Sequence, residues 1–298
     1  MHNSQDVYVE KPLTHRLEEG PAALDAQNRY RRIVQVGQQQ RSMPQFQKGY
    51  ELVKSGQLGP IRKVHLTWNR NAPRGSGDYN ISRSSVDWKA WLGSAPDQPF
   101  DPYRFREWRW FWDFGGGVLA DLMVHYIDVA HWYLQADQPE QAVTIGEKYT
   151  NPRWETPDTV QTLLQYSTAQ VYFESTFMNA RNGAMMEFMG TEATLYLDRG
   201  RLELLPERKR DSRNRNLHPP TEPAMEWVLG DGPKGADFYN FPDGEVLHLS
   251  NWLECIRGRK APLAPVEVGI SAASAAHLGN IALRKNTVAH WSTEGHKS

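Results

Sequence analysis

Cysteine is nearly absent from this chain of 298 residues, in which Cys255 is the only one. A single thiol excludes an internal disulfide and any metal site built on several cysteines. No stretch approaches the roughly 20 consecutive apolar residues that a membrane-spanning helix needs. The formal net charge is −1, so composition gives no electrostatic reason to expect a nucleic acid or an anionic membrane as partner. The compartment stays open, with the cytoplasm as the default expectation.

The densest pattern lies between residues 108 and 134. An aromatic run over 108–114 ends in three glycines at 115–117, and neither proline nor glycine follows up to residue 134. Apolar residues recur there at helical spacing, which predicts a helix from Val118 to about Leu134. Polar and aromatic residues four, three and four apart would lie along one stripe of it: Asp121, His125, Asp128 and Trp132.

A carboxylate one turn before an imidazole can hydrogen-bond to one ring nitrogen and leave the other free. Asp121 and His125 would then form an oriented base, and the glycines before them would let a ligand or another backbone come close. The alternative is a buried histidine that its neighbour satisfies, with Asp128 on a solvated face. No second group of ligands accompanies this stripe, so we predict no metal site.

The first 40 residues predict a βαβ unit, with strands over 6–10 and 32–37 and a helix over 14–31. Its strands should be parallel, with a right-handed crossover. Two parallel strands do not form an independently stable sheet. We therefore expect this unit to end a larger sheet or to be covered by another part of the molecule.

Further along, the pattern predicts a helix over 43–55, a strand over 61–68 and a loop-rich region with short helices over 69–113. Short β segments follow in series, and tight links between them favour antiparallel neighbours: 141–149, 159–166, 169–176, 184–190, 193–197 and 201–205. A charged segment over 207–223 predicts an exposed loop. Two helices are expected last, over 244–257 and 269–284.

Three motifs in this order resemble the glucose–fructose oxidoreductase / inositol dehydrogenase (Gfo/Idh/MocA) family: Val9-Glu10-Lys11-Pro12 at the end of a strand, the glycines at 115–117 and Asp121-x-x-x-His125. The resemblance extends over nearly the whole chain and implies an α/β fold with two domains. Residues 1–44 would be the remnant of a parallel, doubly wound Rossmann-type domain. Residues 45–298 would form a substrate-binding and oligomerisation domain with an open, mostly antiparallel sheet and helices on one face.

One feature of that family is not found where it is expected. A Gly-x-Gly-x-x-Gly/Ala fingerprint should join the first parallel strand to its helix. We expect that fingerprint to be absent from this chain, whose glycine-rich runs at 74–77 and 115–117 do not follow a parallel strand. The chain therefore resembles a family member that lacks roughly its first hundred residues, about the size of a mononucleotide-binding half plus flanks. We expect it to be inactive alone.

The resemblance implies an NAD- or NADP-dependent oxidoreductase that acts on a hydroxyl of a sugar or polyol. Lys11 would stabilise charge on the reacting oxygen, His125 would be the general acid/base, and Asp121 would orient His125 and bind a neighbouring hydroxyl. Lys11 and His125 should then face one cleft. The other residues expected at the site would contact the cofactor (Glu10, Lys11, Pro12 and Gln38) or the substrate (Arg41, Arg109, Trp110 and Asp121).

Arg109 could equally be packed against tryptophan, although a cation flanked by aromatic rings suits a sugar or a phosphate. The loop that holds Gln38 and Arg41 could equally be a solvated turn. Two other functions stay open: a non-catalytic sugar-binding or scaffold subunit, and an NAD-assisted glycosidase or lyase. An open sheet face must be covered, so a second copy of the chain is the expected partner.

Overall fold

The βαβ unit predicted at the start of the chain is confirmed. β1 (Val7–Val9) pairs in parallel with β2 (Val34–Val36), and α1 (Glu19–Tyr30) connects them. The computed structural model describes residues 5–72, 77–207, 222–228, 234 and 243–294. Helices from the end of the chain cover the small sheet, as the backbone amide of Val36 donates to Ala264 O (2.8 Å) and His248 Nε2 to Val36 O (2.9 Å).

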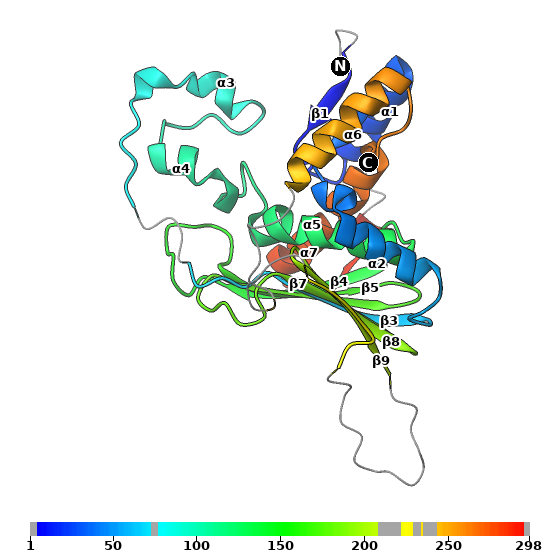
Figure 1. Cartoon of the computed structure of the whole chain (residues 1–298). Helices are drawn as coiled ribbons and strands as arrows, with labels where there is room; N and C mark the ends of the chain where they lie inside the picture. The colour runs from blue at the N-terminus through cyan, green and yellow to red at the C-terminus, as the bar shows by residue number, and fades with distance from the viewer. Residues whose placement is uncertain (1–4, 73–76, 208–221, 229–233, 235–242, 295–298) are drawn as a thin grey trace.

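A larger sheet of nine strands forms the base of the molecule (Figure 1). Its order is β10-β9-β8-β7-β3-β6-β5-β4-β11, and every pair except β3–β6 is antiparallel. All seven strand segments predicted here are confirmed. Among the described residues, β3 separates a three-stranded meander (β4 to β6) from a four-stranded one (β7 to β10). The bounds are β3 Ile61–Thr67, β4 Gln141–Glu147, β5 Thr159–Gln165, β6 Gln170–Thr176, β7 Met185–Gly190, β8 Ala193–Asp198, β9 Arg201–Pro206, β10 Met225–Val228 and β11 Ala289–His290.

Helices cover one face of this sheet: α2 (Pro44–Lys54), α5 (Val124–Leu134) and α7 (Val266–Lys285), with α6 (Gly244–Gly258) above them (Figure 1). The core lies between these helices and the sheet, and the Tyr126 hydroxyl of α5 donates to Ala184 O (3.0 Å). Nine of the eleven residues of α5 are buried, so this helix has no solvated stripe. The alternative that placed Asp128 on a solvated face is wrong, because its side chain is 1% exposed.

The opposite face of the sheet carries no helix in the described part of the chain (Figure 1). Side chains along a strand alternate between the two faces, and some of those on the open face are apolar: Val143 is 40% exposed, Ile145 74% and Leu163 40%. The fold is therefore the predicted one, a small parallel sheet followed by a larger, mostly antiparallel sheet with helices on one face.

The short helices predicted over 69–113 are α3 (Trp88–Leu92) and α4 (Pro102–Arg106), which lie to one side of the sheet (Figure 1). Asp87 caps α3 by accepting from Ala90 N at 3.0 Å. Trp88 and Trp91 stack with ring centroids 4.8 Å apart. A last short helix, α8 (Trp291–Glu294), was not predicted. Most of the predicted charged loop, 208–221, lies outside the described residues.

Candidate active site

The predicted helix after the three glycines begins with a π-helical segment, η4 (Leu119–Met123), and continues as α5. Asp121 bonds to Lys11 and Arg109 instead of His125, and no hydrogen bond joins Asp121 to His125 among the described residues. The predicted hydrogen bond between Asp121 and His125 is therefore not formed.

The glycines let the chain's own backbone come close. A Cβ on Gly115 would lie 2.6 Å from Arg109 O, and one on Gly117 would lie 2.6 Å from Thr156 Cβ. Gly117 also has φ +60°, a conformation that favours glycine. These contacts fold the aromatic run back over the start of the helix, and they place Arg109 beside Asp121.

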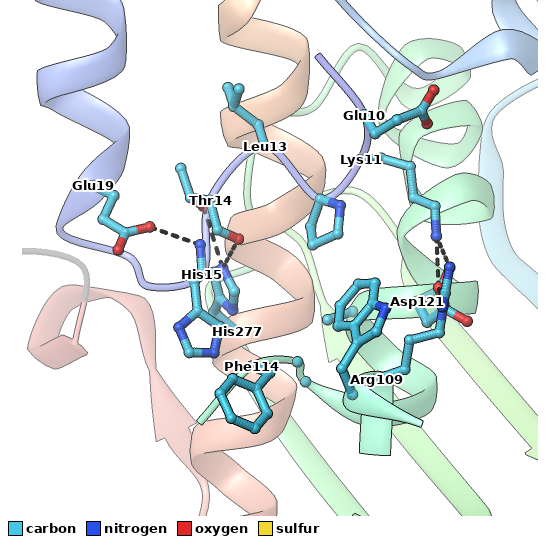
Figure 2. Close-up of a pocket in the computed structure, with 15 residues that line it drawn as sticks. Glu10, Lys11, Leu13, Thr14, His15, Glu19, Arg109, Phe114, Asp121 and His277 are labelled. Carbon is cyan, nitrogen blue, oxygen red and sulfur yellow. Dashed lines mark hydrogen bonds and ion pairs between the residues drawn. The ribbon is translucent and has the colours of Figure 1, made fainter. Parts of the chain in front are cut away.

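Lys11 follows β1 and crosses to η4, 110 residues away in sequence. Its Nζ donates to Asp121 O at 2.5 Å and to Asp121 Oδ1 at 2.9 Å, and Arg109 Nε donates to the same Oδ1 at 3.2 Å (Figure 2). Burial disfavours the ionised carboxylate, but the charges of Lys11 and Arg109 outweigh it and hold the pKa of Asp121 below its ordinary value. An ionised carboxylate thus lies between two cations.

This cluster lines a cavity of about 420 Å³. Its wall is formed by the segment after β1, the glycine turn, η4 and one residue of α7: Glu10–His15, Glu19, Trp108, Arg109, Phe114–Gly116, Ala120, Asp121 and His277. Cations, a carboxylate and aromatic rings around one hollow suit a polyhydroxy ligand. Lys11, Asp121 and Arg109 are brought together here, as are Glu10 and Pro12 from the expected cofactor contacts, although Glu10 points away from Lys11 (Figure 2).

His125 does not line the cavity. Its ring stacks on Trp68, with centroids 5.7 Å apart and an angle of 24° between the planes. Burial, with the positive charges of Lys11, Arg199 and Arg70, lowers the pKa of His125 well below its ordinary value. Its Nδ1 is buried and has no hydrogen-bond partner in the described part of the chain, so His125 is a neutral imidazole with unused hydrogen-bonding capacity there.

Two residues predicted to contact substrate do not line the cavity. Arg41 binds Asp128 through three contacts of 2.8–3.0 Å and lies over the ring of Trp132, in the second half of α5. Trp110 is 1% exposed and stacks on Trp154 at 4.2 Å. Both are held by packing partners far away in sequence, which local spacing could not show.

Gln38, predicted to contact the cofactor, is fully buried. Its Nε2 donates to Val124 O at 3.3 Å and ties the end of β2 to the start of α5, while its Oε1 is enclosed without a partner. Gln38 therefore connects the small sheet to the helix that holds His125. The loop is not a solvated turn at this position.

The described residues do not fit the pyrophosphate of a dinucleotide. That group binds where a helix N-terminus follows a strand, but here Glu18 and Glu19 begin α1. The Glu19 carboxylate accepts from the amides of His15 (2.7 Å) and Arg16 (3.2 Å), and so uses the donors that a phosphate would need. The expectation that the spacing Gly-x-Gly-x-x-Gly is absent from the chain is wrong, because it occurs at 230–235. The strand before it, β10, is antiparallel to its neighbour, whereas the fingerprint follows a parallel strand, and all of the motif except residue 234 lies outside the described residues.

Comparison with known proteins agrees with the motifs. Residues 93–196 match the family model of the GFO/IDH/MocA C-terminal domain. The scyllo-inositol 2-dehydrogenase (NAD(+)) of Bacillus subtilis is 24% identical over 290 residues, which cover 91% of this chain and 68% of that protein. The YteT protein of the same organism is 22% identical over 141 residues, which cover 47% of this chain and only 27% of YteT.

Solved structures share the fold at low identity. The aldose-aldose oxidoreductase of Caulobacter crescentus, complexed with glycerol, superposes with a TM-score of 0.65 at 17% identity, over 96% of this chain and 72% of that one. Levoglucosan dehydrogenase in complex with NADH and L-sorbose superposes with a TM-score of 0.66 at 17% identity, and the match covers 96% of this chain and 73% of that one. An NAD binding oxidoreductase from Klebsiella pneumoniae superposes with a TM-score of 0.67 at 18% identity, and the match covers 96% of this chain and 73% of that one. Residues 93–196 therefore match the C-terminal domain of the Gfo/Idh/MocA family, and over most of its length the chain is similar to oxidoreductases of that type, in agreement with the motifs at 9–12, 115–117 and 121–125.

Proposed function

We propose that this chain is the substrate-binding part of an NAD(P)-dependent oxidoreductase that acts on a hydroxyl of a sugar or polyol. The observation that carries the proposal is Lys11, held against Asp121 and beside Arg109 at the wall of a cavity of about 420 Å³. The relatives named as dehydrogenases of an inositol and of sugars support this choice of substrate class.

Lys11 is suited to hold the reacting oxygen. An ammonium group has three donors, and two of them are directed at Asp121 O and Asp121 Oδ1. The third is left for a substrate hydroxyl in the cavity, where the positive charge would stabilise an oxygen that loses its proton. Asp121 fixes the ammonium in place and, with Arg109, offers hydrogen-bonding groups to a neighbouring hydroxyl.

His125 is the proton acceptor that we assign. Asp121 is a poor base, because its pKa is lowered and two cations already share its carboxylate. His125 is held neutral by burial and by nearby charges that include Lys11, and its Nδ1 has no partner among the described residues. Because the ring does not line the cavity, it must turn toward the bound sugar to take the proton. A nicotinamide, when bound, supplies the hydride acceptor. Because the start of α1 does not fit a pyrophosphate, we propose that the chain alone does not turn over, and that its open sheet face pairs with a second copy.

The test combines binding of sugar and of dinucleotide. Calorimetry with myo-inositol, D-glucose and L-sorbose should show binding that falls at least about tenfold in Lys11→Met, the loss expected for one charge-assisted hydrogen bond. Lys48→Met, on the exposed face of α2, is the matched control. Titration with NADH and NADPH should leave their fluorescence unchanged. Sugar binding that Lys11→Met does not weaken would overturn the site, and dinucleotide binding would overturn the claim of inactivity.

A non-catalytic sugar-binding subunit is the second candidate, favoured by the acidic start of α1. It predicts the same binding results, but no NADH formation under any reconstitution with a dinucleotide-binding partner. Absorbance at 340 nm with NAD⁺ and a bound sugar separates the two candidates.

A further inference from the structure

A second cavity of about 360 Å³ adjoins the first. The two share His15, Gly115, Gly116 and His277, and the second continues between Trp112 and the residues of α7 beyond His277. The oxidation site proposed above uses only the first cavity. The second therefore lies where a group attached to the reacting sugar would extend.

His277 presents an acceptor here. Its side chain is 8% exposed, and its Nε2 lies 3.0 Å from Thr14 O. A carbonyl oxygen only accepts, so Nε2 carries the proton and Nδ1 is left as a lone-pair acceptor. No described residue hydrogen-bonds to Nδ1, and this atom is not among the fully enclosed ones. Burial lowers the pKa of His277 to about 4 despite the bond to Thr14, so the ring is neutral at pH 7.

Asn280 presents a second acceptor one turn further along α7. It is 8% exposed, and its Nδ2 donates to Gly116 O at 2.9 Å. That contact fixes the orientation of the amide, because an Oδ1 there would face another oxygen. Oδ1 has no partner among the described residues and is not enclosed. Both side chains are more than nine-tenths buried, and both line the second cavity.

Donors lie in the same wall. The guanidinium of Arg284 lies over the ring of Trp112, 4.9 Å from its centre, and makes no ion pair within the described ranges; Arg16 makes none either. Asp113 is already paired with Arg104 at 3.1 Å, which leaves Glu18 as the remaining carboxylate. The cavity thus offers free donors and free acceptors together.

We propose that the second cavity binds a second sugar unit, so that the substrate of the proposed oxidoreductase is a glycoside. A sugar hydroxyl donates and accepts, and can therefore satisfy Asn280 Oδ1 and Arg284 at once. A phosphate or carboxylate only accepts, and it would leave the acceptors of His277 and Asn280 unpaired beside a negative charge. The chemistry of the wall therefore favours a neutral hydroxylated ring over an anion. This inference rests on the proposed function, because it extends the same ligand.

The test is calorimetry on the whole chain, comparing D-glucose with maltose and cellobiose, D-galactose with lactose, and D-glucose with glucose 6-phosphate. At least one disaccharide should bind at least tenfold more tightly than its monosaccharide. His277→Gln keeps a donor near Thr14 and removes the Nδ1 acceptor, and Arg284→Ala removes the facing donor. Each should reduce the preference to threefold or less, and Arg284→Ala, at a residue that lines only the second cavity, should leave monosaccharide binding within twofold. Arg257→Ala, an exposed position of α6, is the matched control.

The outcomes separate this inference from the proposed function. Monosaccharide binding that depends on Lys11, without a gain for any disaccharide, overturns the second subsite and leaves the oxidation site standing. A gain that survives both variants also overturns it. If glucose 6-phosphate binds most tightly and only Arg284→Ala weakens it, the cavity is an anion site and the inference is wrong. Absence of binding by every sugar overturns both proposals.

Discussion

The two ends of one helical stretch, residues 119–134, carry the same residue types in opposite situations. At the C-terminal end Asp128 is bound by Arg41, and both nitrogens of His131 are engaged, by Ser271 Oγ at 2.7 Å and Tyr166 Oη at 2.6 Å. At the N-terminal end Asp121 is shared by two cations at a cavity wall, and His125 Nδ1 has no partner. At the C-terminal end the carboxylate and the histidine are thus fully hydrogen-bonded within the protein. At the N-terminal end the carboxylate faces a cavity and the histidine has a nitrogen without a partner among the described residues.

The difference indicates what each end is for. Buried polar groups are normally satisfied, and those of the C-terminal end satisfy one another, so they stabilise the packing of α5. An unsatisfied buried nitrogen costs stability, and it persists where a ligand or a reaction uses it. The pKa values of the two carboxylates differ in the same way. Burial raises the pKa of Asp128 more than the charge of Arg41 lowers it, whereas at Asp121 the charges of Lys11 and Arg109 outweigh burial and lower the pKa.

The largest expected effect on the free energy of unfolding is at Asp128, in the C-terminal part of the helix. Asp128→Asn leaves the Arg41 guanidinium buried without its counter-charge, and breaking a buried pair costs about 3–5 kcal/mol. Asp121→Asn should cost less, because Lys11, although only 13% exposed, keeps its bond to the backbone oxygen of residue 121, and Arg109 is 40% exposed, so water can reach it. Urea unfolding at pH 7 measures both. Equal losses would show that the two carboxylates play the same structural part.

Acid should weaken the fold through its buried histidines. Burial lowers the pKa of His131 to about 3 and that of His277 to about 4, below the ordinary 6.5. The unfolded chain takes up these protons near pH 6.5 while the folded chain does not, so stability is greatest above that pH and falls as the pH drops toward the folded pKa values. Between pH 7 and pH 5 each histidine should cost about 2 kcal/mol.

His131→Gln tests this directly. It removes one proton from the difference between the folded and unfolded chains, so the dependence of the unfolding free energy on pH should become shallower by about 1.4 kcal/mol per pH unit between pH 6 and pH 5. Urea midpoints at several pH values give this slope. An unchanged slope would mean that His131 titrates alike in both states.

The fold could be predicted where the pattern is local. Strands β4 to β9 alternate in polarity and the helices repeat at helical spacing, so their positions followed from the sequence. β11 has two residues and β10 is a short edge strand, and such elements leave little periodicity to detect. The π-helical segment could not be seen at all, because its residues suit an α-helix equally well.

The site could be predicted less well. Lys11, Asp121 and Arg109 came from a family motif and an aromatic context, and the structure places them together. Arg41 was misjudged because its partner Asp128 lies 87 residues away. His277 and Asn280 are three residues apart, which is the spacing of neighbours on one face of a helix. That spacing was the available signal for the second cavity.

The smallest effect on stability should come from His125, and it bears most on mechanism. His125→Phe keeps a ring on Trp68 and removes a buried nitrogen that has no partner, so the free energy of unfolding should change by less than about 1 kcal/mol. His131→Phe removes the shared partner of Ser271 and Tyr166 and should cost about 1–3 kcal/mol. Sugar binding should survive both changes, because neither residue lines the cavity. If urea unfolding shows that His125→Phe and His131→Phe lose the same free energy of unfolding, then Nδ1 of His125 has a stabilising partner in the folded protein. Its assignment as the proton acceptor would then lose its physical basis.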